Sequence, residues 1–199
     1  MRQGRKISIV SRMFAVLLAV MMVCSNISLP SKAAETVQTI AAWEYKDKDS
    51  APSSLPAGAT SGSGQLNVTG ATYTGYSSKS LAANNWEEEG SWTISEINAE
   101  KYENLTFSAS LRSSNTGAKN FQLEYSLDKG QSWMVVAGGA VEITSTNLTQ
   151  LYKDVKLPAE LSGKNFTLRV KKVGTTSVNG GTVALTGASN INHIVIKGT

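Results

Sequence analysis

Apolar and polar residues alternate strictly along three segments of this 199-residue chain, and this period of two constrains the fold more than any other feature. The apolar positions are Leu105, Phe107, Ala109 and Leu111, then Phe121, Leu123 and Tyr125, then Phe166, Leu168 and Val170. Successive side chains of a strand point to opposite faces, so each segment predicts a strand with one buried and one wet face. Such strands are typical of antiparallel sheets rather than of parallel ones.

Short strand-like segments continue along most of the chain. Further strands are expected at residues 37–45, 64–69, 91–97, 133–137, 151–157 and 190–197. Turn-forming clusters such as Gly138-Gly139 separate them, and residues 47–63 and 72–90 are expected as long loops. Many short strands at regular spacing are typical of a sandwich or a barrel. We predict an all-β fold, a two-sheet antiparallel sandwich of jelly-roll type.

The first 33 residues have the pattern of a cleavable export signal. Basic residues precede an uncharged apolar run at residues 13–24, and Ser31-Lys32-Ala33 supplies small residues for a signal peptidase. Cleavage is expected after Ala33, with Ala34 as the alternative. An uncleaved anchor is the other interpretation, although spanning a bilayer takes about 20 apolar residues, and Val23 disfavours a lipid-anchored Cys24. We predict a signal peptide at 1–33, a single β-sandwich domain at 34–199, and a secreted, extracellular or cell-surface location with no membrane contact after processing.

Removing the signal changes the sign of the net charge. The whole sequence carries 19 basic and 15 acidic residues, a net charge of +4. The signal contains no acidic residue and five basic ones: Arg2, Arg5, Lys6, Arg12 and Lys32. The remainder therefore holds 14 basic and 15 acidic residues, a net charge of −1. Nucleic-acid binders keep a basic patch, so no nucleic-acid partner is expected. The only cysteine lies in the signal, which excludes disulfides and thiol chemistry from the remainder.

No catalytic constellation is apparent in residues 34–199. His193, the only histidine, lies in an apolar strand pattern, where we expect a packed, hydrogen-bonded residue, and no G-x-S-x-G motif accompanies it. Glycoside hydrolysis uses two carboxylates about 5–10 Å apart, and the E-x-D-x-x-E string common in jelly-roll glycanases is missing. We therefore predict no catalytic residues and a protein that is not an enzyme.

The stretch at residues 72–90 carries the residue types that recognise sugars. It combines the aromatic rings of Tyr73, Tyr76 and Trp86 with the amides of Asn84 and Asn85. Sugar recognition uses apolar stacking together with a few oriented hydrogen bonds. We predict that these residues bind a glycan or cell-wall polymer. The alternative is that the rings close the end of the sandwich, and burial of all three would favour a structural or protein-interaction domain.

Carboxylates in the two expected loops offer hard oxygen ligands. They are Asp47, Asp49, Glu87, Glu88 and Glu89. Such ligands suit calcium, although no loop matches an EF-hand or an RTX repeat. A structural calcium ion at these residues is a hypothesis, and no other cofactor is expected.

Residues 126–133 have the spacing S-x-D-x-G-x-x-W, which resembles the Asp-box of bacterial sialidases and other secreted β proteins. The Asp128 carboxylate can accept bonds from backbone N–H groups of the turn, and Gly130 can take a positive φ without steric cost. Trp133 is expected to pack back on the core. Since the motif occurs once, in a chain too short for a propeller, we interpret it as a structural turn that serves folding.

Six stretches together carry a resemblance to a known family: residues 42–45, 102–107, 113–117, 120–128, 178–182 and 191–199. Residues 39–199 resemble the N-terminal β-sandwich module, jelly-roll and carbohydrate-binding-like, of large secreted bacterial nucleases, phosphoesterases and other surface hydrolases. The resemblance implies an accessory, non-catalytic role in binding or adhesion, because its motifs are core and turn residues. The alternatives are a structural or protein-interaction domain, or the N-terminal fragment of a larger secreted hydrolase such as a nuclease.

Overall fold

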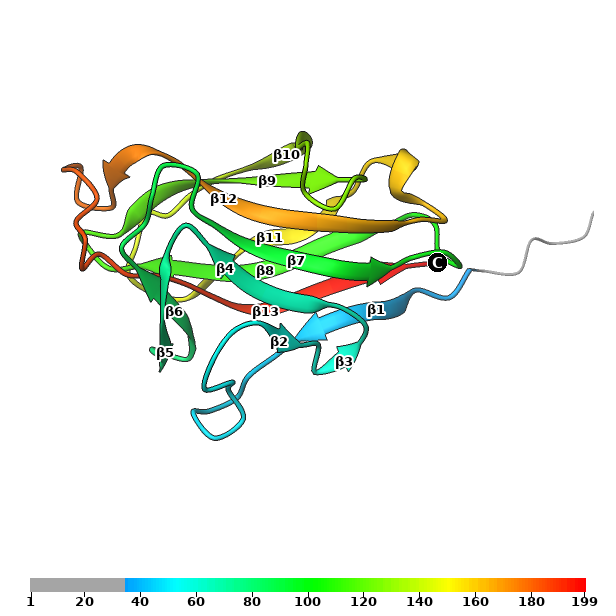
Figure 1. The fold of residues 1–199 in the computed structure, drawn as a ribbon, viewed down its shortest axis with the longest axis horizontal. Coiled ribbons are helices and arrows are strands. Elements are labelled where there is room, and N and C mark those ends of the chain that lie inside the picture. Colours follow the sequence, from blue (N-terminus) through cyan, green and yellow to red (C-terminus); the bar gives the residue numbers. More distant parts are fainter. Residues whose placement is uncertain (1–34) are drawn as a thin grey trace, which may run out of the picture. The chain divides into compact units, whose positions relative to one another are not determined.

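Two antiparallel β-sheets pack against each other around an apolar core (Figure 1). The structure, a computed structural model, describes residues 35–199. The predicted signal peptide, its cleavage point and Cys24 lie outside the described residues. The prediction of an all-β, two-sheet antiparallel sandwich is confirmed.

The first sheet, here called the β13 sheet, has β13 near its centre. Its strands are β1 (Gln38–Trp43), β3 (Ser61–Gly62), β5 (Thr72–Ser77), β6 (Ser80–Asn84), β8 (Thr106–Ser113), β11 (Thr149–Lys156) and β13 (Ser189–Gly198). β13 pairs with β8, β1 and β6, and β6 in turn pairs with β5. The β5–β6 hairpin is thereby attached to the middle of the sheet.

The second sheet, here called the β12 sheet, has the order β10-β9-β12-β7-β4-β2. Its strands are β2 (Ala57–Gly58), β4 (Gln65–Thr69), β7 (Ser91–Asn98), β9 (Ala118–Ser126), β10 (Met134–Glu142) and β12 (Asn165–Ser177). A short 3₁₀ helix, η2 (Ala159–Leu161), precedes β12. From β6 onward most connections cross between the two sheets, as in a jelly roll.

The alternating residues form the core as predicted. Phe107, Leu123 and Leu168 are fully buried, and the other apolar positions of the same three strands lie in the same cluster. Trp43 and Trp92 are the largest fully buried side chains of this core. The polar residues that alternate with this apolar set occupy the opposite face of each strand. That face is less exposed than the sequence pattern predicts, because Ser108, Ser110 and Thr167 are buried as well.

Two expectations about loops are wrong. Residues 72–90 contain the β5–β6 hairpin, because β6 finds its partner in β13, more than a hundred residues further along the chain. Gly138 and Gly139 do not separate strands but lie within β10, where the register with β9 shifts between Val135 and Ala140. Gly138 has a φ of 72° there, a conformation that glycine adopts readily. Residues 47–63 include the short strands β2 and β3 among turns.

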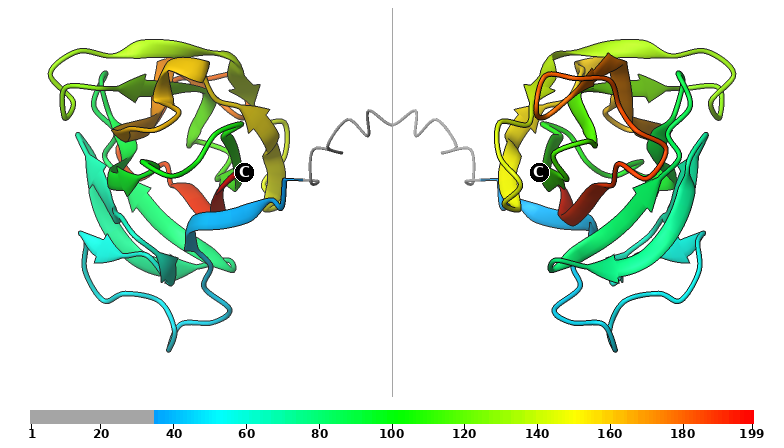
Figure 2. Two further views of the ribbon diagram at one scale, coloured as in Figure 1. Left: turned by 90° about the vertical axis from the view of Figure 1, so that its right-hand side faces the viewer. Right: turned by 90° about the vertical axis from the view of Figure 1, so that its left-hand side faces the viewer.

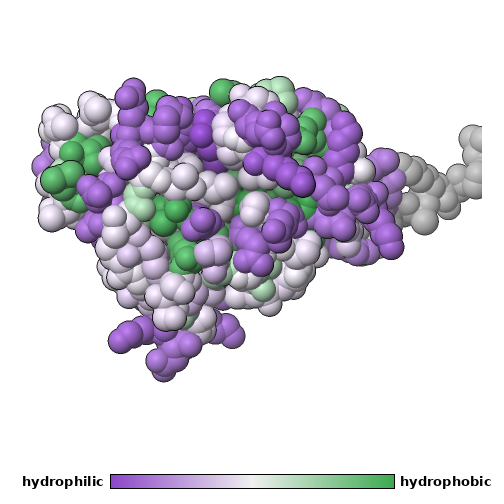
Figure 3. Space-filling model, viewed as in Figure 1, coloured by the Kyte–Doolittle hydropathy of each residue, from purple (hydrophilic) through white to green (hydrophobic). Residues whose placement is uncertain are grey.

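The surface is mostly polar around this core. In the end-on views of Figure 2, the loop between β1 and β2 extends away from the two sheets. Figure 3 shows a largely hydrophilic face over the β12 sheet, with an apolar area at the end formed by the loop between β12 and β13. Leu185 in that loop is the most exposed large apolar side chain among the described residues. Within residues 35–199 no helix is long and apolar enough to cross a membrane.

Candidate functional site

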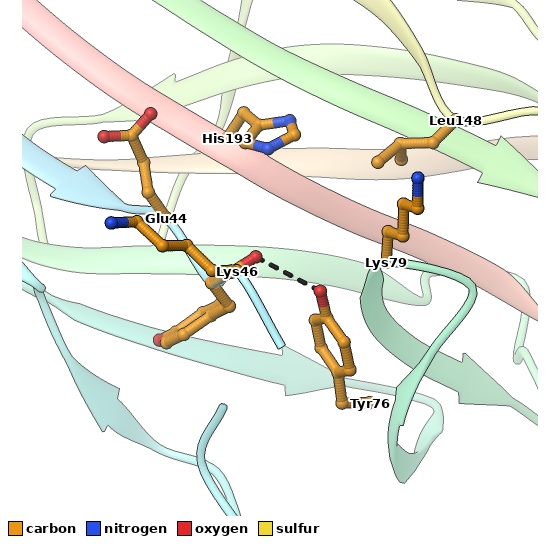
Figure 4. Close-up of a pocket in the computed structure, with 7 residues that line it drawn as sticks. Glu44, Lys46, Tyr76, Lys79, Leu148 and His193 are labelled. Carbon is orange, nitrogen blue, oxygen red and sulfur yellow. Dashed lines mark hydrogen bonds between the residues drawn. The ribbon is translucent and has the colours of Figure 1, made fainter. Parts of the chain in front are cut away.

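A hollow of about 270 Å³ lies on the outer side of the β13 sheet, where the end of β1, the β5–β6 hairpin and β13 meet (Figure 4). We call it the β13 groove. Its lining residues are Glu44, Tyr45, Lys46, Tyr76, Lys79, Leu148 and His193. These residues come from four separate parts of the sequence, so tertiary structure alone brings them together.

The buried amide of Asn192 holds these segments in place. Its Nδ2 donates hydrogen bonds to the carbonyl oxygens of Tyr45 and Lys79, each at 2.8 Å. Its Oδ1 accepts a bond of 3.1 Å from the backbone N–H of Tyr45. Because Asn192 is only 1% exposed, these bonds form away from water and fix the backbone beneath the groove. Sequence analysis missed Asn192, although an amide in an apolar strand is a signal that it has a specific partner.

Two tyrosines, Tyr45 and Tyr76, line the groove. The Tyr76 hydroxyl donates to the carbonyl oxygen of Tyr45 at 3.2 Å, and the Tyr76 side chain remains partly exposed. Burial raises the pKa of Tyr45 to about 12, with a smaller contribution from Tyr73. Burial and the nearby Asp47 carboxylate also raise the pKa of Tyr76. Both hydroxyls therefore stay protonated at neutral pH and can donate hydrogen bonds.

Charged side chains are distributed unevenly along the groove. Figure 4 shows the heads of Glu44 and Lys46 toward one end, Lys79 with Leu148 at the other, and the His193 ring between them. Among residues 35–199, neither Lys46 nor Lys79 forms an ion pair. One end is thus of mixed charge and the other is cationic.

His193 is exposed, and the expectation that it packs into an apolar strand is wrong. The register between β13 and β8 shifts between Asn192 and Val195, and His193 has a φ of 49° at this bulge. A bulge inserts an extra residue and re-aims its side chain, which turns the ring outward. Its Nδ1 lies 3.3 Å from the Ser110 hydroxyl.

The residues predicted to bind a ligand do not form one site. Tyr76 lines the groove, whereas the Tyr73 hydroxyl donates to the carbonyl oxygen of Pro52 at 2.7 Å and holds that segment. Burial raises the pKa of Tyr73. Asn84 ends β6 and the exposed Asn85 follows it, and neither lines the groove.

Trp86 is 9% exposed and lies in the core, which contradicts its predicted contact with a ligand. Its ring meets Trp92 and Phe121 edge to face, at centroid distances of 5.8 and 5.9 Å. Its indole N–H donates to the carbonyl oxygen of Ala83. The ring therefore closes the sandwich, as the alternative interpretation expected for it.

Two of the five carboxylates considered for calcium, Asp47 and Glu89, are bonded to other residues of the protein. Asp47 accepts a bond of 2.8 Å from the backbone N–H of Ser50, and its bonds with Ser50 lower its pKa. Glu89 pairs with Lys171 at 2.6 Å and with Arg169 at 3.5 Å, and the bond from Lys171 is the main cause of its lowered pKa.

The other three carboxylates, Asp49, Glu87 and Glu88, are exposed. Within residues 35–199 no three acidic or histidine side chains gather into a group that could hold a metal ion. A structural calcium ion stays a prediction.

The turn at residues 126–133, here called the Asp128 turn, satisfies its own polar groups. Asp128 Oδ1 accepts bonds from the Ser126 hydroxyl at 2.6 Å and from the backbone N–H of Ser132 at 2.9 Å. Gly130 has a φ of 90° and its N–H donates to the Ser126 hydroxyl. The bonds to the Asp128 carboxylate, led by the one from the Ser126 hydroxyl and followed by the one from the Ser132 hydroxyl, hold the pKa of Asp128 well below its usual range.

Trp133 does not pack on the core, and that expectation is wrong. Its ring lies on the outer side of the β12 sheet, where the Arg169 guanidinium is 4.3 Å from the ring centroid. Arg169 also pairs with Glu124 at 2.6 Å. The ring is thus covered by a cation that is itself held by a carboxylate.

A larger hollow of about 710 Å³ adjoins this turn on the β12 sheet. We call it the β12 groove. It is lined by Ser63, Ser95, Glu96, Asn98, Leu127, Lys129, Asn165, Phe166 and Thr167. Phe166 is buried and no other aromatic residue lines this groove, so it offers little ring surface for stacking.

Comparisons with known proteins found no matching protein-family model and no matching curated protein. Among solved structures the chain is similar to a family 29 carbohydrate-binding module from Piromyces equi. The identity is 10%, the match covers 82% of this chain and 91% of that one, and the TM-score is 0.46. A second family 29 module is 12% identical, with coverage of 82% and 90% and a TM-score of 0.48.

A variant module of that family complexed with cellulohexaose is 12% identical, with coverage of 81% and 91% and a TM-score of 0.47. Another variant, complexed with mannohexaose, is also similar, at 10% identity. These likenesses concern the fold. No link to nucleases or phosphoesterases is among them, so the expected placement ahead of such domains stays a prediction.

Proposed function

We propose that this protein is a non-catalytic carbohydrate-binding module that is exported and holds a glycan or cell-surface polymer in the β13 groove. The observation that carries the proposal is the combination of a partly exposed ring, Tyr76, with charged hydrogen-bonding heads on a backbone anchored by Asn192. A sugar ring needs an apolar surface and a few oriented polar groups. An anchored backbone lowers the entropy lost when these groups engage a ligand.

The chemistry of the groove favours binding over hydrolysis. Glu44 is the only carboxylate among its lining residues, whereas glycoside hydrolysis uses a pair. His193 and Ser110 are close, but a serine nucleophile also needs a group that orients the histidine. No carboxylate of the described residues forms a hydrogen bond with His193.

Thermal unfolding of the protein with a panel of soluble polysaccharides tests this proposal. A ligand that binds only the folded state raises the unfolding midpoint, and we expect at least one polysaccharide to do so. In the Tyr76→Ala variant this ligand-induced shift should disappear. The Tyr73→Ala variant is the matched control, because Tyr73 lies on the same strand outside the groove, and it should keep the shift.

If no polysaccharide raises the midpoint of a cooperatively unfolding protein, the proposal fails. The structural or protein-interaction interpretation would then take its place. A shift that survives in Tyr76→Ala would retain carbohydrate binding but remove it from the β13 groove.

A further inference from the structure

We propose that the β13 groove selects acidic sugar chains, and that Lys79 and His193 hold the carboxylate of a uronic acid residue between them. This inference rests on the proposed function and adds the class of sugar. Three observations support it: the difference in charge between the two ends of the groove, the positive φ values of Lys79 and His193, and the hydrogen bonds that orient these two residues.

Lys79 occupies a turn position that lysine rarely takes. Ser78 and Lys79 form the two-residue connection of the β5–β6 hairpin, with φ values of 50° and 60°. A two-residue turn with both φ values positive strongly prefers asparagine and glycine. Strain of this kind concentrates at functional sites, and here it places a lysine ammonium at the cationic end of the groove (Figure 4).

Asn192 supports this conformation from below. Its Nδ2 donates to the Lys79 carbonyl oxygen, which fixes the turn against β13. Asn192 also precedes His193 in the sequence, so one buried residue positions both proposed ligands of the carboxylate. The positive φ of His193 adds a second strained residue at the same site.

One nitrogen of the His193 ring lies beside the Ser110 hydroxyl, which leaves the other nitrogen for a ligand. When the Ser110 hydroxyl donates to Nδ1, the ring proton resides on Nε2, which can then donate to an acceptor in the groove. Lys79 has three donors and no ion-pair partner among residues 35–199. A carboxylate has two oxygens and can accept one bond from each residue.

The acidic groups near the groove lie at its other end or have partners of their own. Figure 4 places the Glu44 carboxylate at the opposite end, beside Lys46. Asp47 is bonded to Ser50 and interacts with the charge of Lys46. We infer that the sugar carboxylate lies toward Lys79, while sugar hydroxyls donate to Glu44.

Isothermal titration with oligogalacturonate and oligomannuronate, each compared with its methyl ester, tests the inference. Esterification removes the charge and keeps the sugar chain. We expect at least one free acid to bind about tenfold or more tightly than its ester, because hydrogen bonds to charged groups are the stronger ones. Its affinity should fall as salt is added, since screening weakens charge interactions.

Two lysine variants locate the charge. Lys79→Gln should weaken binding of the acid about tenfold and leave binding of the ester nearly unchanged. Lys129→Gln is the matched control, because Lys129 also has a φ of 60° but lies at the β12 groove. His193→Asn should weaken acid binding as well, since asparagine tolerates positive φ.

The outcomes separate the two proposals. Equal affinity for acid and ester, or binding of neutral polysaccharides alone, overturns the proposal that the groove selects acidic sugars. The proposal of carbohydrate binding would remain. Loss of acid binding in Lys129→Gln but not in Lys79→Gln overturns the assignment to this groove. If no saccharide of any class binds, both proposals fail.

Discussion

The β13 groove and the Asp128 turn are each organised by one polar side chain that bonds to the backbone. They differ in how far apart in the sequence the bonded residues lie. Asp128 bonds to residues at most four positions away. Asn192 bonds to Lys79 and Tyr45, which lie 113 and 147 positions away. The first device shapes a single turn, whereas the second joins segments that meet only in the folded protein.

The two regions also differ in what they leave available to a ligand. The Asp128 turn uses its acceptors internally, and Arg169 covers the half-buried ring of Trp133. In the β13 groove, Asn192 bonds to the backbone of Tyr45 and Lys79. Lys46 and Lys79 have no ion pair in the described part of the chain. We infer that the turn serves folding and the groove serves binding.

Loss of the long-range hydrogen bonds of Asn192 should have the largest effect on stability. The Asn192→Leu variant removes the side-chain partner of the Tyr45 N–H and of the Lys79 carbonyl oxygen, and leaves the Tyr45 carbonyl oxygen with the Tyr76 hydroxyl alone. We expect the free energy of unfolding to fall by about 3 kcal/mol, measured by urea denaturation. Asn147→Leu, at an exposed asparagine, is the control and should change it by less than about 0.5 kcal/mol. A loss below about 1 kcal/mol in Asn192→Leu would show that the anchor is dispensable.

An intermediate effect on stability is expected from loss of Arg169, whose side chain connects the Asp128 turn to the β12 sheet. Arg169→Met removes the partner of Glu124, whose side chain is only 12% exposed, and uncovers Trp133. We expect the free energy of unfolding to fall by about 2 kcal/mol, again measured by urea denaturation. Adding Glu124→Gln should restore part of the loss, because the unpaired charge is removed. A double variant no more stable than Arg169→Met would contradict this account.

The smallest effect is expected inside the turn, and it should depend on pH. The pKa of Asp128 is lowered by folding, so its contribution to stability is present above the unfolded pKa of about 3.9 and declines as the pH falls further. The difference in unfolding midpoint between wild type and Asp128→Asn should therefore be constant from neutral pH to about 5 and shrink below about 4. Asp49→Asn controls for the loss of an exposed acidic charge. A difference that grows in acid would refute the bonding described for Asp128.

Sequence reasoning reached the features that depend on nearby residues. The alternation around Phe107, Leu123 and Leu168 predicted the core because burial on one face of a strand appears directly in the sequence. The bonds around Asp128 and the positive φ of Gly130 were accessible for the same reason, since they close within one turn.

The remaining features depend on distant partners. The sequence predicts a loop where the β5–β6 hairpin lies, because the strand that β6 pairs with, β13, is distant in the sequence. Trp86 and Trp133 were assigned opposite environments from those observed, because no local pattern shows which face of a sheet a ring covers. Tyr76 was found by its residue type, but Lys79, Asn192 and His193 join it only through tertiary contacts.

The most direct test of the central claim is an NMR titration that follows the backbone amides of isotope-labelled protein as a binding polysaccharide is added. Our account predicts that the largest chemical-shift changes occur at Tyr45, Tyr76, Lys79 and His193, around the β13 groove. Changes concentrated at Ser95, Lys129 and Thr167 would place the ligand in the β12 groove and contradict the account, and so would the absence of any change.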